Sequence, residues 1–316
     1  MMSILQYKTK NKVKKILADV ARYIVLISFS YMLIYPIIFM VFNALKSTAD
    51  YYDVTVQWIP KNWSVQSFKI AFKSIDYINS LKSSFINEIV AALIEVVSCM
   101  IAAYGLSRFN IKGKAFFNAV MIITMLIPFP MLLIPSYVNF RFVDFAGILK
   151  LIGNLVGKEL RPSILDTPLV FWLPSLLAVG LKGSLFIYIY CQFFKGLPKE
   201  LEEAAFIDGA GPWKTFFNII IPSSTTSIIT VLLFSVIWHW NDSLLAQTYL
   251  SDNFPLGVQL SNINQLVARN VEGITSMNQG GVIMAVCTLM IAPTVIFYVI
   301  VQKRFIESIS TSGIVG

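Results

Sequence analysis

Five ionisable side chains stand inside otherwise apolar stretches of this sequence, and they are the groups best able to do chemistry: Glu88, Glu95, Lys182, His239 and Asp242. A charged group in an apolar environment is costly, so such residues usually face a protein interior or a water-filled cavity. There they can form ion pairs and hydrogen bonds with a polar solute. Lys182 and Glu95 can instead form a buried ion pair with a purely structural role, and that alternative stays open.

The residue types needed for catalysis are scarce. The chain has one histidine and three cysteines, and the cysteines (Cys99, Cys191 and Cys287) lie far apart in apolar runs without the spacing of metal ligands. The run 180–184 contains Gly and Lys but lacks the spacing of a phosphate-binding loop. We therefore predict no catalytic residues, no metal site and no cofactor bound by this chain. The alternative that the chain is an enzyme acting inside a membrane is therefore disfavoured.

A second group of candidates combines aromatic rings with hydrogen-bonding side chains: Trp238, His239, Trp240, Asn241, Asp242 and Tyr188. Aromatic faces together with a few polar groups suit a sugar ring, because it has both an apolar face and many hydroxyls. With Lys182 and Glu95, these residues form the predicted substrate pathway. The structural alternatives are an aromatic belt at the membrane interface for the two tryptophans and a satisfied core histidine for His239.

The composition indicates an integral membrane protein. Of the 316 residues, 56% are hydrophobic and only 13% are charged, whereas soluble domains average about 25% charged. The mean hydropathy is +0.70. The net charge of +8 is explained by membrane topology, so we expect no nucleic-acid partner.

Six apolar segments are long enough to cross a bilayer as helices, since a spanning helix needs about 20 residues. We therefore predict an all-α integral membrane protein with about six transmembrane helices, at 23–45, 83–106, 115–139, 168–194, 223–246 and 280–302. Pro128, Pro130 and Pro135 should kink the third helix, which would suit a helix that lines a path. The loop 140–167 should contain a short external helix.

The placement of lysine and arginine predicts the orientation of these helices. Positive residues crowd the stretch before residue 23, the short loop near residue 110 and the segment 195–214. We therefore expect both termini in the cytoplasm, together with the loop between the fourth and fifth helices. Residues 1–22 would form a basic cytoplasmic N-terminus, and residues 23–316 would form one transmembrane domain.

The polar loop 198–222, between the fourth and fifth predicted helices, encodes two short helices. Pro198 suits the first helical residue, and Gly209 can take the positive φ that ends a helix. On the first helix, three residues should share one face: Leu201, Ala204 and Ala205. On the second, helical spacing predicts one apolar stripe: Trp213, Phe216, Phe217 and Ile220.

This loop resembles the EAA loop of the membrane subunits of binding-protein-dependent ABC importers. Glu203-Ala204-Ala205, Gly209 and the run Ile219-Ile220-Ile221-Pro222 match its fixed positions, except that Ile221 replaces a leucine. The resemblance implies that the first short helix docks into a cleft on an ATP-binding subunit. It assigns the coupling role to Glu203, Ala204, Ala205, Asp208, Gly209, Ala210 and Pro222.

Two further motifs resemble the MalG-like permease subunits of carbohydrate importers: Trp240-Asn241-Asp242 and the tail Gln302-Lys303-Arg304-Phe305 with Gly313-Ile314-Val315-Gly316. The resemblance implies a multi-pass subunit of the bacterial inner membrane that transports a carbohydrate, with an oligosaccharide favoured. It implies a second MalF-like permease subunit, two copies of an ATP-binding subunit that bind ATP and Mg²⁺, and an extracellular solute-binding protein. An importer of an amino acid, peptide or phosphate is the nearer alternative.

Overall fold

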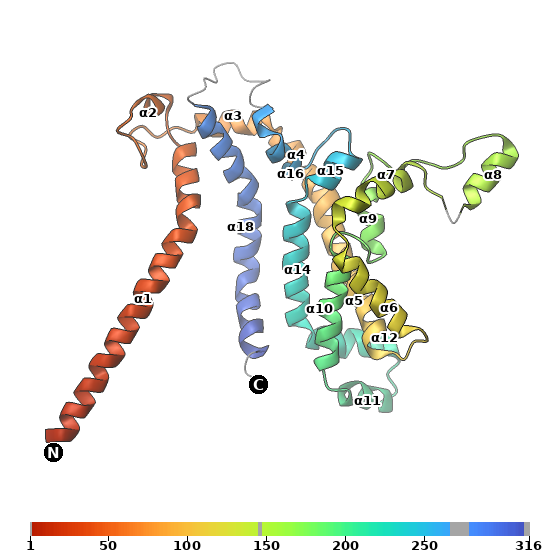
Figure 1. Cartoon of the computed structure of the whole chain (residues 1–316), viewed down its shortest axis with the longest axis horizontal. Helices are drawn as coiled ribbons and strands as arrows, with labels where there is room; N and C mark the ends of the chain where they lie inside the picture. The colour runs from red at the N-terminus through yellow and green to blue at the C-terminus, as the bar shows by residue number, and fades with distance from the viewer. Residues whose placement is uncertain (1, 145–146, 266–277, 313–316) are drawn as a thin grey trace. The chain divides into compact units, whose positions relative to one another are not determined.

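The computed structural model describes residues 2–144, 147–265 and 278–312 (Figure 1). In these residues the regular structure is helical, and the β-bridge between Lys46 and Trp63 belongs to no strand. Three helical stretches are long and apolar enough to cross a membrane: Lys14–Ala44, Tyr77–Arg108 and Gln279–Lys303. The number rises to five if each of two sharply bent helix pairs is one span. The predicted all-α membrane class is confirmed, and the tail 313–316 lies outside the described residues.

The chain divides into two compact units, Met1–Ser74 with Val267–Leu289, and Ile75–Leu266 with Met290–Gly316. The first unit contains α1 (Met2–Ala44), α2 (Thr48–Tyr52), α3 (Gln66–Ser74) and the start of α18 (Gln279–Ser312). In this unit the long helix α1 includes residues 2–22 of the predicted cytoplasmic stretch. The loop after α1 is fixed by the buried Lys46, whose Nζ donates to the carbonyls of Val56 and Gln57 at 3.2 and 3.1 Å.

The second unit contains the remaining helices and the end of α18. Its first part comprises α4 (Tyr77–Ser83), the π-helix η1 (Ser84–Ile89), α5 (Val90–Arg108), α6 (Lys114–Leu126), η2 (Phe129–Leu132), α7 (Leu133–Arg141), α8 (Ile148–Val156), α9 (Leu169–Leu176) and α10 (Gly183–Gly196). Its second part comprises α11 (Glu200–Ile207), α12 (Pro212–Thr215), the π-helix η3 (Phe216–Ile220), α13 (Ile221–Ser223), α14 (Thr225–Trp240), α15 (Leu244–Tyr249) and α16 (Leu256–Ser261). The predicted short helix in the loop 140–167 is confirmed as α8.

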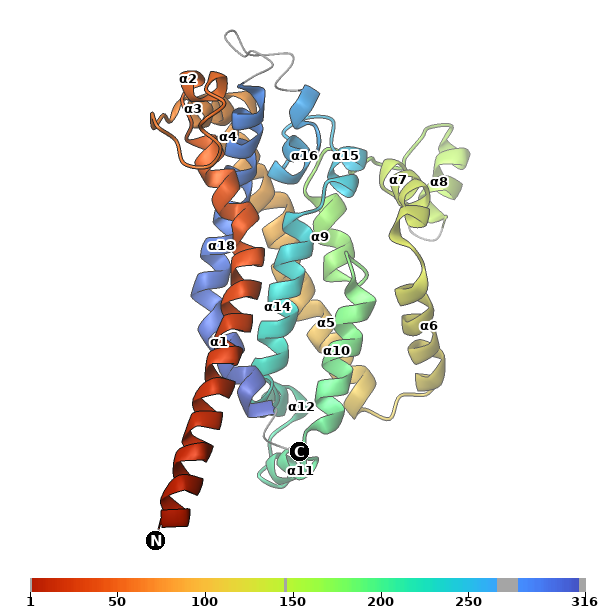
Figure 2. The ribbon, with the colours of Figure 1, turned by 60° about the vertical axis from the view of Figure 1, so that its left-hand side comes forward.

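The core of the second unit lies where α5 packs against α9, α10 and α14 (Figure 2). Small residues on α5, including Cys99 and Ala103, allow close approach of the rings of Phe186 and Tyr190 on α10. Cys99 and Cys191 are buried and unpaired, as small core residues. Burial of these apolar side chains holds α5 and α10 side by side.

The third predicted helix, 115–139, is broken rather than kinked. The segments Lys114–Leu126 and Phe129–Arg141 meet at 104°. Ile127 has extended backbone because it precedes Pro128, which disfavours helical geometry in the residue before it. Pro130 removes another donor, and a 3₁₀ turn takes the chain into α7. Pro135 is the third residue of α7, where a proline is tolerated.

The prediction of one continuous helix over 168–194 is wrong. α9 ends at Leu176 and α10 begins at Gly183, and between them Ala178 and Lys182 have φ of 58° and 68°. The carboxylate of Glu95, on α5, fills the space at this break. A Cβ on Gly180 would lie 2.7 Å from its Oε1, so a larger residue would force the carboxylate to shift. The buried carboxylate therefore favours glycine at this position.

Candidate functional site

The first short helix of the polar loop ends as the sequence predicts. α11 runs over Glu200–Ile207 and begins two residues after Pro198, later than predicted. Gly209 has φ +78°, its N–H donates to the carbonyl of Phe206, and the N–H of Ala210 donates to the carbonyl of Ala205. This paired pattern satisfies carbonyls that the helix end would otherwise leave free. The prediction that Gly209 ends the helix is confirmed.

A buried acidic residue that the sequence did not single out fixes α11 to the end of α5. Glu202 Oε1 accepts a hydrogen bond from the hydroxyl of Tyr104 at 2.9 Å. Its Oε2 lies 3.2 Å from Nε of Arg108, and both charged side chains are less than a tenth exposed. Arg108 also donates from Nη2 to the carbonyl of Leu197 at 2.8 Å. Three buried groups thus link the polar loop to a core helix.

The predicted face of α11 is only partly exposed. Ala205 is buried on the same side as Glu202, three residues earlier, whereas Leu201 and Ala204 are exposed. The three residues keep the predicted helical spacing, and the anchored Glu202 turns the Ala205 edge of their face inward. The exposed side chains of α11 include Glu203, Phe206 and Ile207, and Asp208 beyond its end is also exposed.

The residues of the predicted stripe on the second short helix differ in burial. Its three aromatic rings, Trp213, Phe216 and Phe217, contact one another, although residues 216–220 form the π-helix η3 and not the expected α-helix. Phe216 and Ile220 are buried, and the ring of Phe216 packs on Tyr104 at 4.8 Å between centroids. Trp213 and Phe217 are exposed and stack on each other. One helix segment thus has an anchored side and an exposed aromatic side.

Pro222 lies near the predicted turn into the next long helix. It is exposed within the short α13, and Ser224 separates α13 from α14. The segments Pro212–Ser223 and Thr225–Trp240 meet at 78°. The predicted helix 223–246 is shorter than expected, because α14 ends at Trp240 and a separate α15 follows.

Two of the predicted pathway residues meet at the broken fourth helix. Oε2 of Glu95 lies 3.3 Å from Nε2 of His239, and both side chains are buried. His239 Nδ1 lies 2.9 Å from the carbonyl of Ser235. The Ser235 carbonyl can accept a hydrogen bond from Nδ1, which orients the ring so that Nε2 faces the Glu95 carboxyl group.

Lys182 does not pair with Glu95, so the predicted Lys182–Glu95 ion pair is wrong. Lys182 has left-handed backbone immediately before α10, and its side chain is exposed. Its Nζ lies 5.9 Å from the ring centroid of Trp238, close enough for a weak cation–π interaction. Tyr188, also on α10, is exposed, and Trp238 is half-buried.

The run 238–242 does not form one cluster. Trp240 is only 3% exposed, its Nε1 donates to the carbonyl of Met290 at 3.2 Å, and its ring packs edge-on against Phe85. Asn241 is exposed. The carboxylate of Asp242 accepts from the backbone N–H groups of Leu245 and Ala246, and so caps α15. Successive residues of a helix end point in different directions, which separates these side chains.

The chain is similar to known membrane transport proteins. A sequence profile described as "Binding-protein-dependent transport system inner membrane component" matches residues 95–311. The probable ABC transporter permease protein YurM of Bacillus subtilis is 26% identical over 318 residues, which cover 99% of this chain and 94% of the relative.

Two other relatives are named for what they transport. The probable starch degradation products transport system permease protein AmyC of Thermoanaerobacterium thermosulfurigenes is 25% identical, covering 90% of this chain and 93% of AmyC. The polygalacturonan/rhamnogalacturonan transport system permease protein YtcP of Bacillus subtilis is 25% identical, covering 96% of this chain and all of YtcP (100%).

A solved structure shares the fold. A bacterial ABC transporter involved in the import of the acidic polysaccharide alginate has a chain that matches with a TM-score of 0.68 at 20% identity. The match covers 92% of this chain and 96% of that chain.

Proposed function

Because the chain belongs to the family of binding-protein-dependent transport system inner membrane components, we propose that it is one permease subunit of an ATP-driven carbohydrate importer. As a family member it is a transport subunit of the bacterial inner membrane with several membrane-crossing helices. Its proposed partners are a second MalF-like permease subunit, two copies of an ATP-binding subunit and an extracellular solute-binding protein. ATP and Mg²⁺ bind to the partner ATPase.

The relatives that are named for what they transport support a carbohydrate as the substrate. Proteins named for transport of starch degradation products and of polygalacturonan or rhamnogalacturonan align with at least nine tenths of this chain. Both names refer to polymers or their fragments, so an oligosaccharide is the proposed substrate. The aromatic and amide side chains exposed near the broken fourth helix suit such a ligand.

The proposed topology has six passes, counting the broken pair α9 and α10 as one. Both termini and the loop 198–222 lie in the cytoplasm. Residues 1–22 form a basic cytoplasmic N-terminus, and residues 23–316 form one transmembrane domain. In the second unit, α11 lies at the end of the bundle opposite α4 and α16 (Figures 1 and 2). The end near α4 then faces the outside.

The anchoring of Glu202 is the observation that best supports a coupling role for α11. A docking helix transmits force only if it is rigidly joined to the helices that move. Tyr104 and Arg108 make that joint from the end of α5. We assign the contact with the ATPase to the exposed side of the loop, from Glu203 and Ala204 through Asp208, Gly209 and Ala210 to Pro222. Ala205 packs beneath it.

Gly209→Pro tests the coupling assignment. Proline cannot reach φ +78°, so the end of α11 must change its path. The complex with its ATPase and second permease, purified and reconstituted with the binding protein, should keep hydrolysing ATP but transport little carbohydrate. Gly211→Pro, at φ −75°, is the matched control because proline accepts that backbone. Normal uptake by the Gly209 variant would disprove the assignment.

The proposed substrate pathway retains the side chains that are accessible in this chain: Lys182, Tyr188, Trp238 and Asn241. Glu95 and His239 hold the broken helix beneath them, while Trp240 and Asp242 act through packing and capping. An importer of an amino acid, peptide or phosphate remains the second candidate. A thermal-shift screen of the cognate binding protein against oligosaccharides, amino acids and phosphate separates the two.

A further inference from the structure

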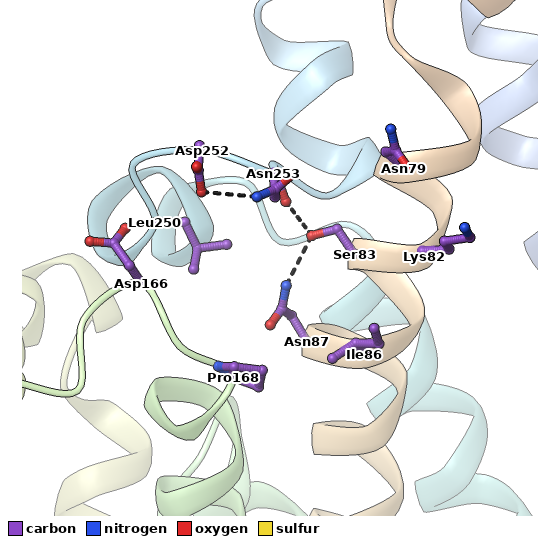
Figure 3. A pocket seen from close by; sticks show the side chains of 10 residues that line it. All are labelled: Asn79, Lys82, Ser83, Ile86, Asn87, Asp166, Pro168, Leu250, Asp252 and Asn253. Carbon is purple, nitrogen blue, oxygen red and sulfur yellow. Dashed lines mark hydrogen bonds between the residues drawn. The ribbon is translucent and has the colours of Figure 1, made fainter.

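A polar pocket of about 280 Å³ lies at the end of the second unit that carries α4, opposite α11 (Figure 3). Its walls come from three separate parts of the chain: residues 79–87, residues 166–168 and residues 250–253. We call it the polar end pocket. Its size is close to the lower limit of small-molecule sites, so it fits one ring-sized group rather than a long chain.

Hydrogen bonds between these segments hold the pocket open. The hydroxyl of Ser83 donates to the carbonyl of Asn253, and Asn87 Nδ2 donates to Oγ of Ser83 at 2.9 Å (Figure 3). Across the pocket, Asp166 Oδ1 accepts from the N–H of Ser251. Asp166 and Asn253 both have positive φ, at 62° and 48°. Strained backbone of this kind persists where the surroundings impose it, and it is frequent at binding sites.

One buried acceptor in the wall lacks a partner. Asn87 is 6% exposed, and its Oδ1 has no hydrogen-bond partner among the described residues. In Figure 3 this oxygen points toward the space between η1 and Pro168. Asn87 also belongs to a π-helix, a local widening that often occurs at functional positions. A ligand hydroxyl donating to Oδ1 would satisfy it.

The chemistry of the lining selects for a hydroxyl-rich ligand. Lys82 supplies a cation, Asp166 and Asp252 supply carboxylates, and Asn79 supplies an amide. A phosphate would meet two carboxylates, and a small cation would meet Lys82. A polyol can donate to a carboxylate at one part of the lining or accept from an ammonium or amide group at another, so it is not repelled by either charge. Ile86, Pro168 and Leu250 add apolar surface for the C–H face of a sugar ring.

We propose that the polar end pocket binds one glycosyl unit of the imported carbohydrate at the outer end of this subunit. The inference rests on the proposed carbohydrate function and adds a location to it. Binding is weak, because a transported ligand must leave. Asn79, Lys82 and Asp252 are exposed and make the first contacts, while Asn87 offers the unpartnered oxygen.

Saturation-transfer NMR on the assembled importer in nanodiscs, without the binding protein, tests this proposal. The probes are maltotriose, diacetylchitobiose and digalacturonate. Asn79→Ala and Asp252→Ala should each weaken binding of the responding probe about fivefold, the effect of losing one hydrogen bond. Asn154→Ala is the matched control, because Asn154 is an exposed asparagine on α8 outside the pocket. The thermal midpoint of each variant verifies that it is folded.

Uptake by the wild-type importer distinguishes failure of the pocket assignment from failure of the proposed carbohydrate function. If it transports a probe carbohydrate but the folded Asn79 and Asp252 variants bind it as tightly as the Asn154 variant, the pocket assignment is overturned and the proposed function stands. If it transports none of a broad set of carbohydrates but does transport another solute, the proposed function falls, and the pocket assignment with it.

Discussion

At the scale of single residues, neighbouring acidic side chains have different roles. Glu202 and Glu203 are adjacent and both lie in the first turn of α11. Only Glu202 points inward to Tyr104 and Arg108. The helix exposes Glu203, so a change there affects what meets the loop from outside, whereas a change at Glu202 affects the fold itself.

Glu202→Ala should destabilise the purified chain by about 3 kcal/mol, because it leaves the buried Arg108 without its counter-ion. Glu203→Ala should change stability by less than about 0.5 kcal/mol, as for most surface substitutions. Thermal unfolding of the two variants in the same detergent compares them directly. Equal midpoints would show that the Glu202 ion pair contributes nothing to stability.

The two tryptophans of the 238–240 run should also behave differently. Trp240→Ala removes a buried ring and a hydrogen bond to Met290, so it should cost about 3 kcal/mol or more and lower the yield of folded protein. Trp238→Ala, at a half-buried ring, should lower carbohydrate uptake per folded complex with less effect on yield. Uptake and yield are measured on the same preparations. If Trp240→Ala instead lowered uptake per folded complex and left the yield unchanged, Trp240 would belong to the substrate pathway.

At the scale of elements, the broken fourth helix is the most specific feature of the bundle. α9 and α10 are separated by residues with positive φ, and the Glu95 carboxyl occupies the interruption. His239 on α14 approaches the same carboxyl. The helices α5 and α14 therefore meet the break between α9 and α10 at one buried polar group, and protein surrounds the interrupted backbone.

Gly180→Ala tests this arrangement. The new Cβ would lie 2.7 Å from Glu95 Oε1 and 2.8 Å from Ser175 Oγ, so the substitution should cost about 1–3 kcal/mol. Gly196→Ala, at the end of α10, is the control because nothing lies within 4 Å of its added Cβ. Thermal unfolding should show a loss for Gly180→Ala only. Recovery of stability in a Gly180→Ala/Glu95→Ala double variant would identify the carboxyl as the obstacle.

At the scale of the whole molecule, the second unit joins two ends of different character. One end carries α11 and the exposed aromatic pair Trp213 and Phe217. The other end carries the polar end pocket. The central helices α5, α10 and α14 connect them. An importer needs this separation, because ATP is hydrolysed on one side of the membrane and substrate arrives on the other.

Glu203→Lys should weaken assembly with the ATP-binding subunit. The substitution reverses an exposed charge and puts a cation at the positive end of α11, so it opposes both the docking surface and the helix dipole. The ATPase that co-purifies with a tagged importer should fall, and raising the salt concentration should reduce the difference from wild type. Glu200→Lys, at the first residue of the helix, measures the dipole effect alone. Equal recovery of the ATPase in the Glu203 variant and wild type would exclude a contact there.

The sequence by itself determined the membrane class, the helical character and the end of the first short helix in the loop 198–222. Apolar length, the composition of the loop 198–222 and the glycine at 209 are local properties, so they could be read from neighbouring residues. The end of α11 at Gly209 follows from backbone conformation alone, and the structure agrees with it. The individual assignments to coupling and to the pathway remain predictions.

Tertiary structure alone decided where each side chain points. The rotation of α11 depends on Tyr104 and Arg108, which lie about 100 residues earlier in the chain. The pairing of Glu95 with His239 instead of Lys182 depends on a helix break that apolar composition does not reveal. The polar end pocket likewise joins three distant segments. Hydrophobic patterning gives the length of a helix, but its breaks and facing partners depend on contacts with residues far away in sequence.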